Sequence, residues 1–159
     1  MNEFFEQLVS YNLWANRRLG DYLLKIDPAN LDREIVSSFP SIRKTVHHIW
    51  DAELIWLARI EGEVLDWPPS AAFKNPAIDQ FANTSERFLL KTREFSPGDE
   101  SRLIHFNDSR GKPYSRRLGD IIMHCMNHST FHRGQLITLF RQCELSDIPN
   151  TDLINFKRE

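Results

Sequence analysis

The chain has 159 residues, 41% of them hydrophobic and 26% charged, which is typical of one globular domain with a substantial core. The formal net charge is −2 and the 20 Lys and Arg residues are scattered, so we expect no nucleic-acid partner. No apolar run approaches the ~20 residues of a membrane span, and the acidic start lacks the basic segment of a secretory signal. These features predict a single domain over residues 1–159 with no membrane partner.

Hydrophobic periodicity predicts two long helices in the first half of the chain. The first runs from about Asn2, which can cap it, to Ile26, where Asp27-Pro28 is expected to end it. The second begins near Ser41 and ends near Gly62, with its apolar residues on one face.

Two more helices are expected in the second half, one over residues 77–95 and one from about Leu118 to Cys143. Between them, short apolar runs flank a glycine-containing turn in residues 103–114, which predicts a small hairpin. Residues 147–152 are expected to be irregular. The pattern predicts an all-α protein, a four-helix bundle with a small hairpin before the last long helix. The long connection between the second and third helices indicates that the topology is not one of short loops only.

The last predicted helix carries histidines at positions i, i+4 and i+8: His124, His128 and His132. Residues four apart are neighbours on a helix face, so adjacent pairs can clamp a divalent metal. His124 and His132 would lie about 12 Å apart along the axis, too far for one ion with metal–nitrogen bonds of about 2.0–2.1 Å. Geometry therefore leaves two alternatives, His124/His128 or His128/His132.

A third ligand would have to come from another helix. On the second helix, His48 has apolar residues at i+4 and i+7, which indicates an inward face, whereas His47 is expected to form an exposed pair with Asp51. His105, in the predicted hairpin, could line the mouth of such a site. Three imidazoles leave coordination positions open, which is typical of a reactive metal rather than a structural one.

The two cysteines are Cys125 and Cys143. On one helix they would lie about 27 Å apart, beyond the reach of a disulfide, so we expect reduced thiols and a cytoplasmic location. Cys125 also stands three residues before His128, a ligand spacing, although a buried cysteine more often acts as a small apolar side chain.

Three segments resemble signatures of the DinB family, also called DinB/YfiT-like. Residues 11–19 are similar to its tyrosine-asparagine-x-tryptophan-alanine-asparagine motif. Residues 41–53 are similar to a motif in which a histidine precedes a glutamate by five positions, and residues 127–135 to asparagine-histidine-x-x-x-histidine-arginine-glycine-glutamine. The closing residues 148–154 also resemble the family, so the similarity spans nearly the whole chain.

The resemblance implies a four-helix bundle that holds a divalent metal, Zn, Ni or Fe, through His48, His128 and His132, and it implies a homodimer. Gln135, on the same side of the helix as the last two, is expected near them. Some relatives transfer a low-molecular-weight thiol to an electrophile, so the resemblance favours a thiol S-transferase with a small-molecule substrate. A metal-dependent hydrolase and a non-catalytic metal- or ligand-binding stress-response bundle remain alternatives. No catalytic residue beyond the ligands is indicated.

Other motif residues have structural interpretations. Glu53 points away from His48, so we expect it to hydrogen-bond to the first helix near Asn12 or Asn16. Arg133 turns away from the histidine face, which indicates a salt bridge or a dimer contact. Gly134 in a helix costs up to ~1 kcal/mol relative to alanine, which suggests the close approach of another helix.

Overall fold

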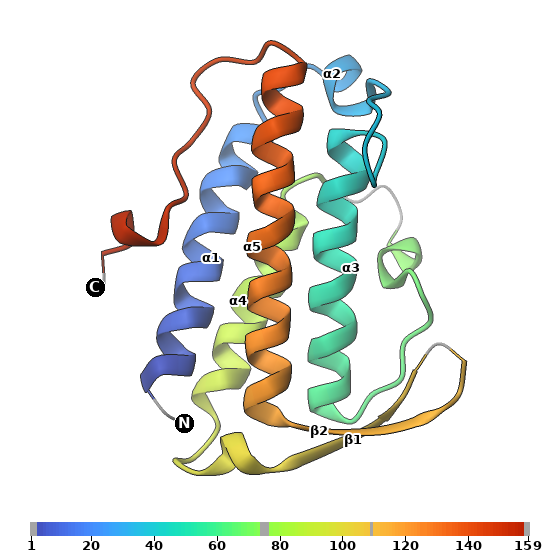
Figure 1. Cartoon of the computed structure of the whole chain (residues 1–159), viewed down its shortest axis with the longest axis vertical. Helices are drawn as coiled ribbons and strands as arrows, with labels where there is room; N and C mark the ends of the chain where they lie inside the picture. The colour runs from blue at the N-terminus through green and yellow to red at the C-terminus, as the bar shows by residue number, and fades with distance from the viewer. Residues whose placement is uncertain (1–2, 74–76, 109, 158–159) are drawn as a thin grey trace.

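The computed structural model describes residues 3–73, 77–108 and 110–157, which form four long helices packed as a bundle (Figure 1). These helices are α1 (Glu3–Leu23), α3 (Ile42–Glu61), α4 (Gln80–Arg93) and α5 (Leu118–Gln142). Each of α1 and α3 packs against both α4 and α5. Figure 1 shows that α1 and α5 run in one direction and α3 and α4 in the other. The chain between α3 and α4 must therefore return along the bundle, which explains the long connection.

Shorter elements cover the ends and sides of the bundle. They are α2 (Pro28–Asp32), η1 (Pro69–Ala72), η2 (Asp99–Ser101), β1 (Leu103–Asn107), β2 (Pro113–Arg117) and η3 (Leu153–Asn155). The strands β1 and β2 pair antiparallel, with Leu103 opposite Arg117, and β2 leads directly into α5 (Figure 1). The predicted hairpin is confirmed. Within the described residues, none of the helices combines the length and apolar character needed to cross a bilayer.

The helix ends follow local capping chemistry. The Ser41 hydroxyl accepts the backbone N–H of Lys44 at 3.1 Å to start α3, and Gly62 ends it with a φ of 81°, which favours glycine. The first helix ends at Leu23, earlier than expected, because the backbone N–H groups of Lys25 and Ile26 bond three residues back and not four; Asp27 then caps α2. The predicted cap Asn2 lies outside the described residues.

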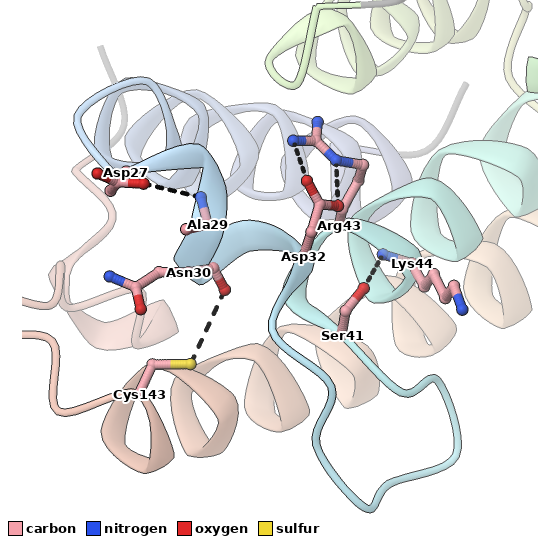
Figure 2. Close-up of polar contacts among 8 residues, drawn as sticks. All are labelled: Asp27, Ala29, Asn30, Asp32, Ser41, Arg43, Lys44 and Cys143. Atoms are coloured by element: carbon pink, nitrogen blue, oxygen red, sulfur yellow. Dashed lines mark hydrogen bonds and ion pairs between the residues drawn. The ribbon is translucent and has the colours of Figure 1, made fainter.

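Side-chain contacts tie α2 to the start of α3 and the end of α5 (Figure 2). Arg43 donates to both carboxylate oxygens of Asp32, at 2.7 and 3.0 Å. The Cys143 thiol lies 3.9 Å from the Asn30 carbonyl oxygen. Both connections hold this end of the bundle together, next to the first turns of α3 from which His48 projects.

The core consists of two apolar clusters with a polar layer between them. One cluster, near α2, includes Leu19, Leu23, Ile49, Phe81, Leu136 and Phe140. The other, near the hairpin, includes Val9, Leu57, Phe88, Leu118, Ile122 and Cys125. The polar layer contains buried residues of all four long helices, namely Asn12, Asn16, Glu53, Ser85, Ser129 and Arg133.

Glu53 lies at the centre of this polar layer with 0% of its surface exposed. Its carboxylate accepts hydrogen bonds from the side chains of Asn12 at 2.8 Å, Asn16 at 2.9 Å and Ser129 at 2.9 Å, and also from Ser85. A buried carboxylate is tolerated only when its lone pairs are satisfied in this way. The expected bond from Glu53 to the first helix is confirmed, and it reaches both asparagines.

Arg133 completes the layer from the other side. Its guanidinium donates to the amide oxygens of Asn12 and Asn16 and to the Thr130 hydroxyl, and only 2% of the residue is exposed. The two asparagines therefore bridge Glu53 and Arg133, with the amide nitrogens on the carboxylate and the amide oxygens on the guanidinium. The expectation of a dimer contact at Arg133 is wrong, because the side chain is buried within its own bundle.

The close approach expected at Gly134 occurs instead at Gly119. A Cβ added to Gly134 would meet nothing within 4 Å, so the expectation of a neighbouring helix there is wrong. A Cβ on Gly119 would lie 2.8 Å from the Phe5 ring and 3.3 Å from the Glu100 carbonyl oxygen. The absence of a side chain at Gly119 thus lets α1 and η2 approach the start of α5.

Candidate metal centre

Three histidines come together at the contact between two helices. His48 lies on α3, and His128 and His132 lie one turn apart on α5. One ligand atom from each ring lies within 4.8 Å of the other two, and the Nε2 atoms of His48 and His128 are 3.0 Å apart. The structure therefore brings together the three residues that the family resemblance implies as ligands.

The spacing of these nitrogens suits a single divalent ion. With bonds of about 2.0–2.1 Å, a tetrahedral ion holds neighbouring ligand nitrogens about 3.3 Å apart. The 3.0 Å between His48 and His128 is close to that value, and the ligand atoms of all three rings lie within 4.8 Å of one another. Among the described residues, no thiol or carboxylate joins the group. The donor set is thus three imidazoles.

The Nδ1 atoms of His132 and His128 differ in their hydrogen bonding. The Nδ1 atom of His132 lies 2.7 Å from the Gln135 amide oxygen, and because that oxygen only accepts, Nδ1 carries the proton. The Nε2 lone pair of His132 then faces the other rings, which is the arrangement of a metal-ligating histidine held by an outer partner. The Nδ1 atom of His128 is buried without a partner in the described structure.

The electrostatics of the cluster favour neutral rings. Burial, and second to it the neighbouring His132, lower the pKa of His48 from 6.5 to about 4. Burial, followed by the neighbouring histidines, lowers the pKa of His128 to about 3. Both rings are therefore uncharged at neutral pH, the state that metal binding requires.

Aromatic side chains surround the cluster, and sequence reasoning missed them. The Phe39 ring stacks on His48 with centroids 3.9 Å apart and meets His132 edge-on at 5.5 Å. Trp67 lies 6.0 Å from His48, and Phe131 lies 5.1 Å from His132. Phe39 and Trp67 come from the connections on either side of α3. The only available signal was the position of Phe39, two residues before the helix cap.

The other sequence candidates lie outside the cluster. His124 is exposed, and its ring centroid is 6.2 Å from that of His128, too far to join the three nitrogens. The Nδ1 atom of His105 contacts the Ser115 hydroxyl across the hairpin. Cys125 is fully buried in the apolar cluster near the hairpin, so it behaves as an apolar side chain. His47 contacts Trp50 and not the cluster.

The polar layer holds α5 in the rotation that presents its histidines to α3. Ser129 and Arg133 each directly follow a histidine of the cluster and point into the bundle, where they bind residues of α1 and α3. Adjacent helical residues point about 100° apart. Anchoring these two side chains inward therefore directs His128 and His132 toward the α3–α5 contact.

Comparison with known proteins agrees with the fold and the motifs. A model of the DinB family matches residues 1–154. The chain belongs to the DinB family. It is 26% identical over 159 residues to Protein DinB of Bacillus subtilis (strain 168), an alignment that covers 94% of this chain and 91% of that one. A solved DinB-like protein from Bacillus cereus ATCC 10987 matches with a TM-score of 0.66 and 19% identity, over 94% of this chain and 97% of the other. At that identity, the structural match supports the DinB-like fold alone.

Proposed function

We propose that this DinB-family protein binds one divalent metal ion through His48, His128 and His132 and transfers a low-molecular-weight thiol to an electrophilic small molecule. The observation that carries the proposal is the convergence of three imidazoles, from two helices, whose ligand atoms lie within 4.8 Å of one another. Such a ligand set suits Zn, Ni and Fe.

The reaction is a nucleophilic substitution at an electrophilic carbon, with the thiol sulfur as the nucleophile. A metal ion, when bound, acts as a Lewis acid that lowers the pKa of a coordinated thiol. Overall, the thiol loses its proton to solvent, a sulfur–carbon bond forms, and the leaving group departs with its bonding electrons. No oxidant or reductant is required.

The protein's own residues supply orientation and an apolar setting. Gln135 holds His132 in one tautomer, and Phe39 fixes the ring of His48 by stacking. In the described structure, the three histidine rings contact each other, neighbouring aromatic rings and the Gln135 amide. No carboxylate is among these contacts. A hydrolase would be expected to place a carboxylate base near the ion, so these surroundings favour thiol transfer over hydrolysis.

The test is a thiol panel with the metal-loaded protein. Glutathione, bacillithiol and mycothiol are each supplied with chlorodinitrobenzene, and the thioether product is followed by absorbance. We expect metal-dependent turnover with at least one thiol and its loss in His128→Ala. Metal-loaded protein that accelerates none of these conjugations would contradict the transferase assignment.

We further propose a cytoplasmic homodimer. Both cysteines are free and buried, which suits a reducing compartment. Met123 and Phe131, which lie two turns apart on α5, expose 47% and 62% of their surface, which gives a second copy apolar contacts. Light scattering coupled to size-exclusion chromatography tests the dimer, and a monomer mass at micromolar concentration would contradict it.

A further inference from the structure

A cavity of about 420 Å³ lies at the hairpin end of the bundle, and none of the three candidate metal ligands lines it. It is lined by the hairpin, the last turns of α3 and the first turns of α5, including Trp56, Arg59, Phe106, Tyr114 and His124. Its volume is within the range of small-molecule sites, and it combines aromatic walls with a few charged groups, as such sites do.

The guanidinium of Arg59 is the best-placed polar group in this cavity. It stacks on the rings of Trp56 and Phe106, with Cζ 4.5 Å from each centroid. Among the described residues, its N–H groups make no hydrogen bond or ion pair within contact distance, and the charge acting on it is that of the nearby Asp108 carboxylate. Stacking thus fixes the plane of the guanidinium and leaves its donor edge available, which is the arrangement that binds a carboxylate with two parallel hydrogen bonds.

The charges around Arg59 select among anions. Arg116 adds a second cation, while Asp108 and Asp120 add two carboxylates. Asp108 already accepts the backbone N–H groups of Arg110 and Lys112 in the hairpin turn, at 2.8 and 2.9 Å. The two acids would repel a phosphate dianion more strongly than a singly charged group. The cavity therefore favours a monoanionic carboxylate.

Direct contacts connect this cavity to the histidine cluster. The ring of Trp56 lies 5.2 Å from that of His124, which lies 6.2 Å from that of His128. Along α3, Arg59 lies eleven positions after His48, a rise of about 16 Å. Both side chains lean toward the N-terminus of the helix, and the longer side chain of Arg59 reaches farther back, which shortens the span between their ends. A ligand that reaches both places must therefore extend over roughly 10–16 Å.

We infer that the cavity is the binding site for a terminal carboxylate of the thiol cosubstrate, held by Arg59, while its sulfur lies at the histidine cluster. This inference rests on the proposed function and narrows the substrate to elongated thiols with a carboxylate about 10–16 Å from sulfur. Trp56, Phe106 and Tyr114 line the cavity and give the carboxylate end of the ligand apolar contacts.

The test measures two preferences separately by calorimetric titration of the metal-loaded protein. The ratio of the affinities for ω-mercaptooctanoate and ω-mercaptooctanol gives the preference for a carboxylate. The ratio of the affinities for ω-mercaptooctanoate and octanoate gives the preference for a thiol. We expect a carboxylate preference of about 10- to 100-fold in the wild type, the value of one charge-assisted bidentate contact. Short ω-mercaptopropionate, which cannot span the two sites, should bind more weakly than the eight- and eleven-carbon homologues.

Variants assign each preference to its site. Arg59→Gln should lose the carboxylate preference and keep the thiol preference, and Arg59→Lys should lie between. Arg102→Gln is the matched control, because Arg102 also stacks on an aromatic ring, Phe95, at 5.2 Å but does not line the cavity. His128→Ala should lose the thiol preference and keep the carboxylate preference.

The outcomes separate this inference from the function it rests on. An unchanged carboxylate preference in Arg59→Gln, or no such preference in the wild type, overturns the assignment of the cavity while leaving the thiol preference intact. If the wild type shows no thiol preference, the transferase proposal is wrong, and the cavity is still judged by Arg59-dependent binding of octanoate over octanol.

Discussion

We expect the negative charge of Glu53, at the centre of the buried polar layer, to contribute several kcal/mol to the stability of the protein. Replacing Glu53 with glutamine keeps the shape and lets the remaining oxygen accept most of the same bonds. The change removes the negative charge that balances Arg133, which is only 2% exposed. The three hydrogen bonds to Oε1, from Asn12, Asn16 and Ser129, each become roughly 1 kcal/mol weaker when the acceptor is neutral, and the Ser85 hydroxyl loses its acceptor at Oε2. We therefore expect a loss of about 3–4 kcal/mol, within the range for breaking a buried charge pair.

Urea denaturation of the chelator-treated protein, followed by circular dichroism, measures this loss. Glu86→Gln is the matched control, because Glu86 pairs with Arg17 at 2.9 Å on the surface, with about half of each side chain exposed. An exposed pair contributes about 0–1 kcal/mol. If the free energy of unfolding of Glu53→Gln fell by no more than that of Glu86→Gln, the polar layer would not carry the charge balance described above.

Three further predictions concern pH, glycine positions and the outer partner of a ligand. In metal-free protein, the free energy of unfolding should fall as the pH drops from 6.5 toward 4. In the folded state the pKa of His48 is lowered to about 4 and that of His128 to about 3. Over this pH range the unfolded chain therefore binds protons that the folded protein does not, which favours unfolding. Urea midpoints against pH test this, and an equally steep slope in His128→Gln would argue against it. Gly134→Ala should stabilise by up to about 1 kcal/mol, since its Cβ meets open space, whereas Gly119→Ala should destabilise by about 1–3 kcal/mol through overpacking. Thermal melts compare the two, and the same sign for both would contradict the packing. Gln135→Ala should weaken metal affinity about 10- to 100-fold by freeing the ring that it orients, as measured by competition with a chelating dye.

Local patterns were sufficient to predict the long helices and the hairpin. Periodic apolar residues, Ser41 as a cap and Gly62 as a stop act within a few residues, so α3 could be placed almost to its ends. The inward direction of His48 followed from its apolar neighbours one and two turns on. The choice of His128/His132 over His124/His128 came from family resemblance, because spacing alone permits both.

What could not be predicted depends on segments distant in the chain. Arg133 is balanced by amide oxygens from α1, so its burial cannot be read from α5 alone. The expected exposed pair of His47 with Asp51 is wrong, because Asp51 is 4% exposed and accepts the backbone N–H of Ser70 at 2.7 Å. That bond comes from η1, an element with no periodic signal. Phe39 was missed because it too lies in a connecting segment with no periodic pattern.

Metal content per chain tests the central claim most directly. Protein loaded with Zn or Ni, desalted and analysed by inductively coupled plasma mass spectrometry should retain about one ion per chain. His128→Ala should retain almost none, and His124→Ala, whose ring lies outside the three-nitrogen group, should match the wild type. Equal retention by His128→Ala and the wild type, with both variants folded by circular dichroism, would contradict the assignment of the metal centre.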